Sequence, residues 1–163
     1  MKQLVDRFGK EVWLGTAVVV IMLVGLFFYV SNKKTNIASQ VKITYSGHNG
    51  TGSASVKNDT ALRREIIKTD AAKAKLSQYY TNQLLDNVDN LDDYLDEVTT
   101  KLSSANREEM AQTITWILET EYHVKPNSDL HNGDKVKFVV TNHTDKSNPI
   151  KATSKTFKVS GLD

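Results

Sequence analysis

The chain has 163 residues, which is enough for one modest domain with short appendages. It carries 21 Lys and Arg against 19 Asp and Glu, and the resulting net charge of +2 argues against a nucleic-acid partner, since such proteins carry a strong positive field. Cysteine is absent, which excludes disulfides, thiolate zinc sites and cysteine catalysis.

The first predicted element is a membrane-spanning helix over residues 12–30, VWLGTAVVVIMLVGLFFYV. These 19 residues carry no charge. At about 1.5 Å per residue, a helix of this length spans roughly 28 Å, close to the hydrocarbon thickness of a bilayer. A cleaved signal peptide is the alternative, but its apolar core is normally about 7–15 residues long. The sequence SNKKTN that follows offers no cleavage site. We therefore expect an uncleaved anchor that contacts the lipid bilayer.

The orientation of this anchor rests on the length of its flanks. The basic residues on the two sides are tied at three each, so charge counting does not decide it; they are Lys2, Arg7 and Lys10 against Lys33, Lys34 and Lys42. The segment before the anchor, residues 1–11, is short, whereas residues 41–163 after it form a sizeable domain. This difference favours a cytoplasmic N-terminus and an extracytoplasmic domain.

The segment after the anchor is predicted to be a tether followed by a β-hairpin. Residues 31–40, SNKKTNIASQ, are polar and show no apolar period. Apolar residues then alternate with polar ones on either side of GHNGTG, and they are Val41, Ile43, Tyr45, Ala54 and Val56. Alternation around an Asn-Gly pair is a strong hairpin signal, so residues 41–57 are predicted to form two antiparallel strands.

Residues 59–122 are predicted to be helical. They contain no glycine or proline and are rich in Ala, Leu, Glu, Lys and Gln. Asn58 or Asp59 can cap the first helix, and Pro126 is expected to end the helical region.

A heptad-like seam runs through the middle of this helical region. Its apolar residues are spaced by four and three in turn, and they are Leu84, Val88, Leu91, Leu95, Val98 and Leu102. Two interpretations remain open. The seam can pack within the chain, on the helix near residues 110–122 or on the sheet, or it can join copies of the chain into a homo-oligomer. A self-standing coiled coil needs about three to four heptads, and this seam has fewer.

Strand-like alternation returns after Pro126. Val136, Phe138 and Val140 share one face, and Phe157 and Val159 repeat the pattern. β pieces at 41–57 and 130–162 thus flank the helices. The predicted fold class is α+β, a small antiparallel β domain (an Ig-like sandwich is one option) with a helical insertion at 59–122.

The tripeptide HNG occurs twice, at His48 and at His131. Turn chemistry explains both copies, because Asn-Gly pairs favour tight turns between strands. The alternative is a metal site. Such a site needs three or four ligands, and the histidines show no two-ligand spacing such as HExxH. We expect turns and no metal or cofactor.

Catalytic signatures are also missing from the sequence. It contains no GxSxG motif and no phosphate-binding glycine loop. The acidic run between Asp86 and Glu97 lacks the glycine of a calcium loop and is interpreted as the solvated face of a helix. The sequence therefore predicts a protein that is not an enzyme.

The stretch LHNGDKVKFVV followed by KTFKVSGL resembles an extracytoplasmic module of poorly characterised single-pass membrane proteins from low-GC Gram-positive bacteria. An earlier SGHNGTGSAS resembles the first hairpin of that module. The matching residues are Gly47, Asn49, Gly50, Gly52, Ala54, Leu130, Asn132, Gly133, Asp134, Val136, Phe157, Val159, Ser160, Gly161 and Leu162. The intervening helices have no counterpart in the module, and the zinc ribbon of some members is missing here. The resemblance implies a β fold and a location in the bacterial cell membrane, and it implies no active site.

Together these features predict a membrane-anchored cell-envelope protein that presents a non-catalytic binding domain. Its partner would be an envelope protein or a wall polymer. One alternative is a structural oligomer assembled through the seam, and a minor alternative is a hydrolase that acts on the cell wall.

Overall fold

The computed structural model describes residues 33–101, 106–143 and 147–163. The chain divides into two units, Met1–Lys33 and Lys34–Asp163, and the second holds the helices and strands named here. The predicted anchor at 12–30 lies outside the described residues, and so does its contact with lipid. None of the helices in the described ranges is long and apolar enough to cross a bilayer.

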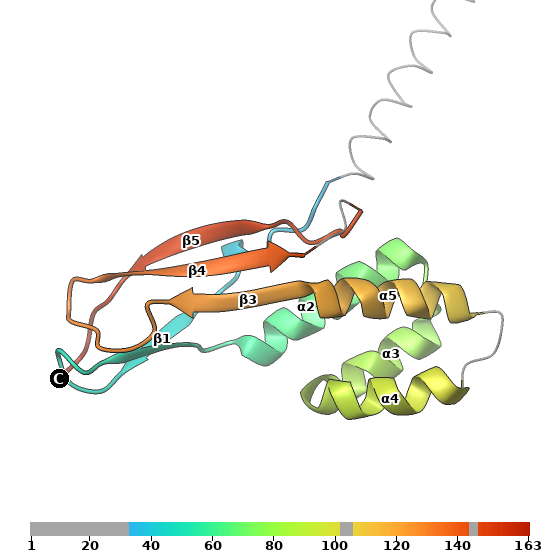
Figure 1. The fold of residues 1–163 in the computed structure, drawn as a ribbon, viewed down its shortest axis with the longest axis horizontal. Coiled ribbons are helices and arrows are strands. Elements are labelled where there is room, and N and C mark those ends of the chain that lie inside the picture. The colour runs from blue at the N-terminus through green and yellow to red at the C-terminus, as the bar shows by residue number, and fades with distance from the viewer. Residues whose placement is uncertain (1–32, 102–105, 144–146) are drawn as a thin grey trace, which may run out of the picture. The chain divides into compact units, whose positions relative to one another are not determined.

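The described unit is a mixed α+β structure with antiparallel sheets, as predicted (Figure 1). A hairpin is formed by β1 (Ile43–Ser46) and β2 (Ser53–Val56). A three-stranded sheet has the order β3 (Thr120–Lys125), β4 (Lys135–Asn142) and β5 (Thr153–Lys158). The described residues thus contain five strands, fewer than the seven of an immunoglobulin sandwich.

Four α-helices and a 3₁₀ turn lie between the hairpin and the sheet in the described sequence. They are α2 (Asp59–Ala74), α3 (Gln78–Asp86), η2 (Val88–Asn90), α4 (Leu91–Lys101) and α5 (Arg107–Glu119). Figure 1 shows α3 and α4 beside the C-terminal part of α2, away from the hairpin. Helix α2 packs on both α5 and α3.

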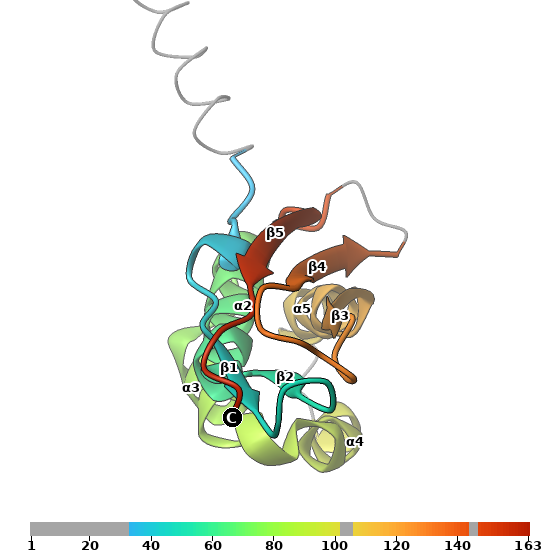
Figure 2. The same ribbon diagram turned by 90° about the vertical axis from the view of Figure 1, so that its left-hand side faces the viewer.

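One hydrophobic core lies between the three-stranded sheet and the β1–β2 hairpin, which Figures 1 and 2 place on opposite sides of it. The residues predicted to share the inner face of β4, Val136, Phe138 and Val140, are all buried there. Leu62 and Ile66 of α2 also reach into this core. Their burial ties the helical insertion to the β domain.

A second hydrophobic core joins the helices, and it contains most of the predicted seam. Its buried members are Ile67, Ala71, Leu76, Leu84, Leu85, Val88, Leu95, Val98 and Met110. The seam is not one helix, because the chain breaks at Asn87, between α3 and η2. The amide of Asn87 donates to the carbonyl of Gln83 at 2.8 Å, and the Asn- and Asp-rich sequence around it has low helix propensity.

The helical region ends at Glu119, so the prediction of helix to residue 122 is wrong. Residues 120–125, TEYHVK, form β3. Thr120 and Val124 are buried, whereas Glu121 and Lys125 are exposed. This period of two, together with the β-branched and aromatic residues, favours a strand over a continued helix.

The predicted tether at 31–40 also differs from the structure in its described part. Ile37 and Ala38 form a 3₁₀ turn and are buried in the first core. Thr35 bridges to Ile150, with its N–H donating to the carbonyl of Pro149 at 2.7 Å. Two apolar residues without a period are enough to anchor a segment when they pack against the core.

Candidate functional site

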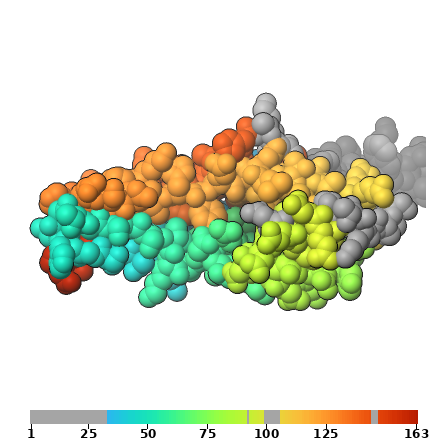
Figure 3. All heavy atoms as spheres, turned by 60° about the horizontal axis from the view of Figure 1, so that its bottom comes forward, coloured from blue at the N-terminus to red at the C-terminus, as the bar shows by residue number. Residues whose placement is uncertain are grey.

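A hollow of about 650 Å³ opens between α2 on one side and the continuous run of α5 and β3 on the other. Figure 3 shows α2 in green beside β3 and α5 in orange on this face of the described unit. We call this hollow the α2–β3 groove. Its lining residues are Asp59, Arg63, Ile66, Ile67, Leu91, Ile117, Leu118, Thr120, Glu121, Tyr122 and His123.

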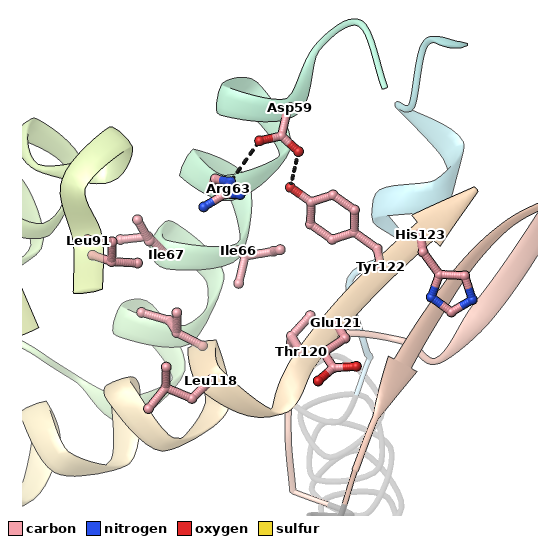
Figure 4. Close-up of a pocket in the computed structure, with 11 residues that line it drawn as sticks. Asp59, Arg63, Ile66, Ile67, Leu91, Leu118, Thr120, Glu121, Tyr122 and His123 are labelled. Atoms are coloured by element: carbon pink, nitrogen blue, oxygen red, sulfur yellow. Dashed lines mark hydrogen bonds and ion pairs between the residues drawn. The ribbon is translucent and has the colours of Figure 1, made fainter. Parts of the chain in front are cut away.

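The floor of the groove is apolar. Ile66 and Ile67 are buried at its base, and Leu91 and Ile117 are half-buried beside them. Leu118 is 59% exposed, although large apolar side chains generally favour burial. Figure 4 shows Leu91, Ile67 and Leu118 together at one end of the groove. The groove therefore offers an unfilled apolar surface to a ligand.

Hydrogen bonds among Asp59, Arg63 and Tyr122, which we call the polar brace, close one side of the groove (Figure 4). One carboxylate oxygen of Asp59, Oδ1, accepts a 2.6 Å hydrogen bond from the Tyr122 hydroxyl. The other, Oδ2, accepts a 2.7 Å bond from Nε of Arg63. Burial, and then the hydrogen bond to Asp59, raises the pKa of Tyr122 well above its ordinary value. The hydroxyl thus holds its proton at neutral pH, and the brace is a structural link rather than an acid–base pair.

The position of Asp59 is set by the residue before it. Asn58 precedes α2, and its side chain does not cap the helix as the sequence suggested. Instead Oδ1 of Asn58 accepts a 2.8 Å bond from the N–H of Lys42, and Nδ2 donates to the carbonyl of Gln40 at 3.1 Å. The start of α2 is thereby fixed to the segment that leads into β1.

The outer rim of the groove carries Glu121 and His123, which lie on either side of Tyr122 along β3 (Figure 4). The Glu121 carboxylate lies 3.0 Å from Nε2 of His143, and both side chains are more than half exposed. An exposed contact of this kind is worth little energy and is easily rearranged. A positively charged group of a ligand can therefore replace the His143 side chain beside the Glu121 carboxylate.

Strand β3 has one free edge, because the sheet order is β3-β4-β5. The N–H of His143 donates to the carbonyl of Glu119, and the register pairs Tyr122 with Val140. Hydrogen-bonded and non-bonded pairs alternate in an antiparallel ladder. Tyr122 therefore lies in a non-bonded pair, with its N–H and C=O directed away from β4. No described residue bonds either group.

The two HNG tripeptides form tight turns, as predicted, and each uses the same hydrogen bond. The N–H of Thr51 donates to the carbonyl of His48 at 3.0 Å, and that of Asp134 donates to the carbonyl of His131 at 3.1 Å. Both glycines have a positive φ, Gly50 at 100° and Gly133 at 101°.

The sequence did not reveal that these two turns pack on each other. The N–H of Asn132 donates to Oδ1 of Asn49 at 2.7 Å. A Cβ at Gly50 would lie 3.2 Å from Nε2 of His131. Even so, the described part of the chain has no group of three or more His, Cys, Asp or Glu side chains placed to hold a metal.

The seam residues are not brought to the surface as a stripe. Leu84, Val88, Leu95 and Val98 are buried in the helical core, and only Leu91 reaches the groove. Leu102 lies outside the described residues. The acidic residues beside the seam, Asp86, Asp89, Asp93, Asp96 and Glu97, are exposed, as expected for a solvated helix face.

One functional candidate was missed by the sequence reasoning. Asp70 of α2 is fully buried, and neither carboxylate oxygen has a hydrogen-bond partner among the described residues. Burial raises the pKa of Asp70 from 3.8 to about 8. In the pattern of α2 it lies four residues after Ile66 and three after Ile67, on the apolar face, and this signal was available in the sequence.

The chain matches no family model, and comparison with curated proteins and with solved structures gives no significant match.

Proposed function

We propose that this chain is a membrane-anchored protein of the bacterial cell envelope whose described domain is a non-catalytic binding module. The uncharged residues 12–30 support the anchor, because a segment of that length and composition is most stable in lipid. The resemblance of residues 41–57 and 130–162 to an extracytoplasmic module supports the location.

The observation that carries the binding role is the α2–β3 groove. It combines an apolar floor, an exposed Leu118 and a free strand edge in one hollow of about 650 Å³. Binding sites are typically concave and mostly apolar, with a few polar groups that fix orientation. The groove is concave and combines an apolar floor with a comparable share of polar surface, with Asp59, Arg63 and Glu121 at its margins.

The anchor and its orientation are tested by protease treatment of intact cells that express the full-length chain with a different tag at each end. We expect the protein to stay in the membrane fraction and only the C-terminal tag to be digested. Recovery of the protein in the soluble fraction, or protection of the C-terminal tag, would contradict the proposal.

The binding role is tested with a photo-crosslinking amino acid at Leu118 in the same cells. The matched control carries the crosslinker at Lys137, which is exposed on β4 and does not line the groove. We expect a discrete adduct from position 118 that the control does not give. Equal patterns from the two positions would remove the groove as the binding site.

A further inference from the structure

We propose that the α2–β3 groove binds an extended peptide, which adds as a strand to the free edge of β3 and places a basic side chain beside Glu121. This inference rests on the proposed binding role and names the class of partner. A wall polysaccharide, or a second copy of this chain, is a different occupant that the experiments below distinguish.

The main chain of β3 can pair with an added strand. The N–H and C=O of Tyr122 point away from β4 in the plane of the sheet and have no partner among the described residues. Edge strands with open donors and acceptors pair readily with another extended chain. A peptide is the ligand that supplies one acceptor and one donor at the spacing of a strand, about 4.8 Å from β3.

The apolar floor of the groove can receive side chains of the peptide. Side chains of an added strand point alternately to the two faces of the sheet. The face that carries the Tyr122 side chain turns toward α2, where Ile66, Ile67 and Leu91 line the groove. Every second side chain of the peptide should therefore be apolar and should cover these residues and the exposed Leu118.

The charge at the rim of the groove favours a basic peptide. Glu121 lies on the outer face of β3, and its exposed partner His143 is held only by a surface contact. At the inner margin the Asp59 carboxylate is already bonded to both Arg63 and Tyr122. The open carboxylate of the groove is thus Glu121, and a cross-strand Lys or Arg of the peptide complements it.

The probe is a fluorescent, end-capped hexapeptide, Thr-Val-Lys-Val-Lys-Thr, titrated with the full-length protein in detergent micelles. Its matched control is the same peptide with N-methyl groups on alternate residues, on the edge that would face β3. Methylation keeps the side chains and removes the main-chain donors. We expect the parent to bind and the methylated peptide to bind at least tenfold more weakly. Equal binding would overturn strand addition.

Two exposed positions test the side-chain arguments with little effect on folding. Leu118→Asp should weaken binding of the parent peptide several-fold. Glu121→Lys should weaken it too, and should improve binding of a peptide in which both lysines are replaced by glutamate. If Glu121→Lys leaves the preference between the two peptides unchanged, the charge assignment is wrong.

The remaining outcomes separate this inference from the proposed function. If no peptide binds while the crosslinker at Leu118 still captures a partner in cells, the peptide inference is overturned and the binding role stands. If the protein instead forms a concentration-dependent dimer that Glu121→Lys abolishes, the edge belongs to a second copy, since Glu121 can face His123 across antiparallel β3 strands, and the inference is also overturned.

Discussion

The hydroxyl of Tyr122 on β3 donates a 2.6 Å hydrogen bond to Asp59 at the start of α2, 63 residues earlier in the chain. This bond joins the helical insertion to the edge strand of the sheet and closes one side of the α2–β3 groove. The bond depends on the end of the helical region before Tyr122, because the phenol side chain then projects from a strand rather than from a helix.

Removing this bond should weaken the fold modestly. Tyr122→Phe deletes the hydroxyl and leaves Asp59 bonded to Arg63. Because the acceptor is charged and the donor half-buried, we expect the free energy of unfolding to fall by about 1–3 kcal/mol. Chemical denaturation measures the change. Tyr79→Phe, at a tyrosine 66% exposed, is the control and should have no effect. A loss equal to that of the control would show that the brace contributes nothing.

Asp70 should make stability depend on pH. Its pKa is raised to about 8 by burial, so the folded protein favours the protonated form. The contribution of protonated Asp70 to the free energy of unfolding is then fully present below pH 3.8, the pKa of the unfolded state. This contribution is lost as the pH rises toward 8. We expect the wild-type free energy of unfolding to fall by several kcal/mol over this interval, at up to about 1.4 kcal/mol per pH unit.

The variant Asp70→Asn keeps the shape of the side chain and removes its titration. It should flatten the pH dependence and exceed the wild type in stability at pH 8. Asp93→Asn, at an exposed residue of α4, should leave the pH profile as it is. Thermal unfolding at a series of pH values measures both. A flat wild-type profile would mean that Asp70 is solvated or paired in solution.

A larger residue at Gly52 should destabilise the fold. A Cβ at this position would lie 2.7 Å from Cδ2 of Leu162 and 3.0 Å from the carbonyl oxygen of Leu130. That carbonyl also accepts bonds from Gly50 and Gly52, so it cannot move freely. We expect Gly52→Ala to lower the free energy of unfolding by about 1–3 kcal/mol. The double variant with Leu162→Ala should recover part of the loss, beyond the effect of each change alone. Strict additivity would contradict the contact.

The helical seam should act as core. Leu84 is completely buried, so Leu84→Ala is expected to lower the free energy of unfolding by about 2–5 kcal/mol. Leu118→Ala in the groove should change it by less than about 0.5 kcal/mol. Denaturation and sedimentation of both variants give the measurement. If Leu84→Ala reduces the oligomeric mass and leaves stability unchanged, the seam is instead a contact between copies.

Much of the β architecture could be predicted from local pattern. Alternation around Asn49-Gly50 indicated the hairpin, and the inner face of β4 was assigned residue by residue. Strand β3 was missed because it follows α5 without a break, and Thr120 was taken as the continuation of a helix. Its own alternation is only six residues long, too short to stand out beside a helix of 13.

The candidate site was harder to foresee than the fold. Asp59, Leu91, Leu118 and Tyr122 are far apart in the sequence, and each has an ordinary local explanation as a cap, a seam residue or a helix residue. These four residues form a groove only because the fold brings them together. The two HNG turns show the same limit, because each turn was predicted from its own residues, but the bond between Asn132 and Asn49 was not.

The sequence by itself determined the local conformations, namely the turns at Asn-Gly, the strands with a period of two and the helix-rich insertion, because these follow from φ/ψ preferences and from the spacing of apolar residues. It also determined the apolar stretch at 12–30. The tertiary structure decided where the seam is buried, which strand edge stays open and which side chains meet across the groove, because packing depends on contacts between residues that no local pattern relates.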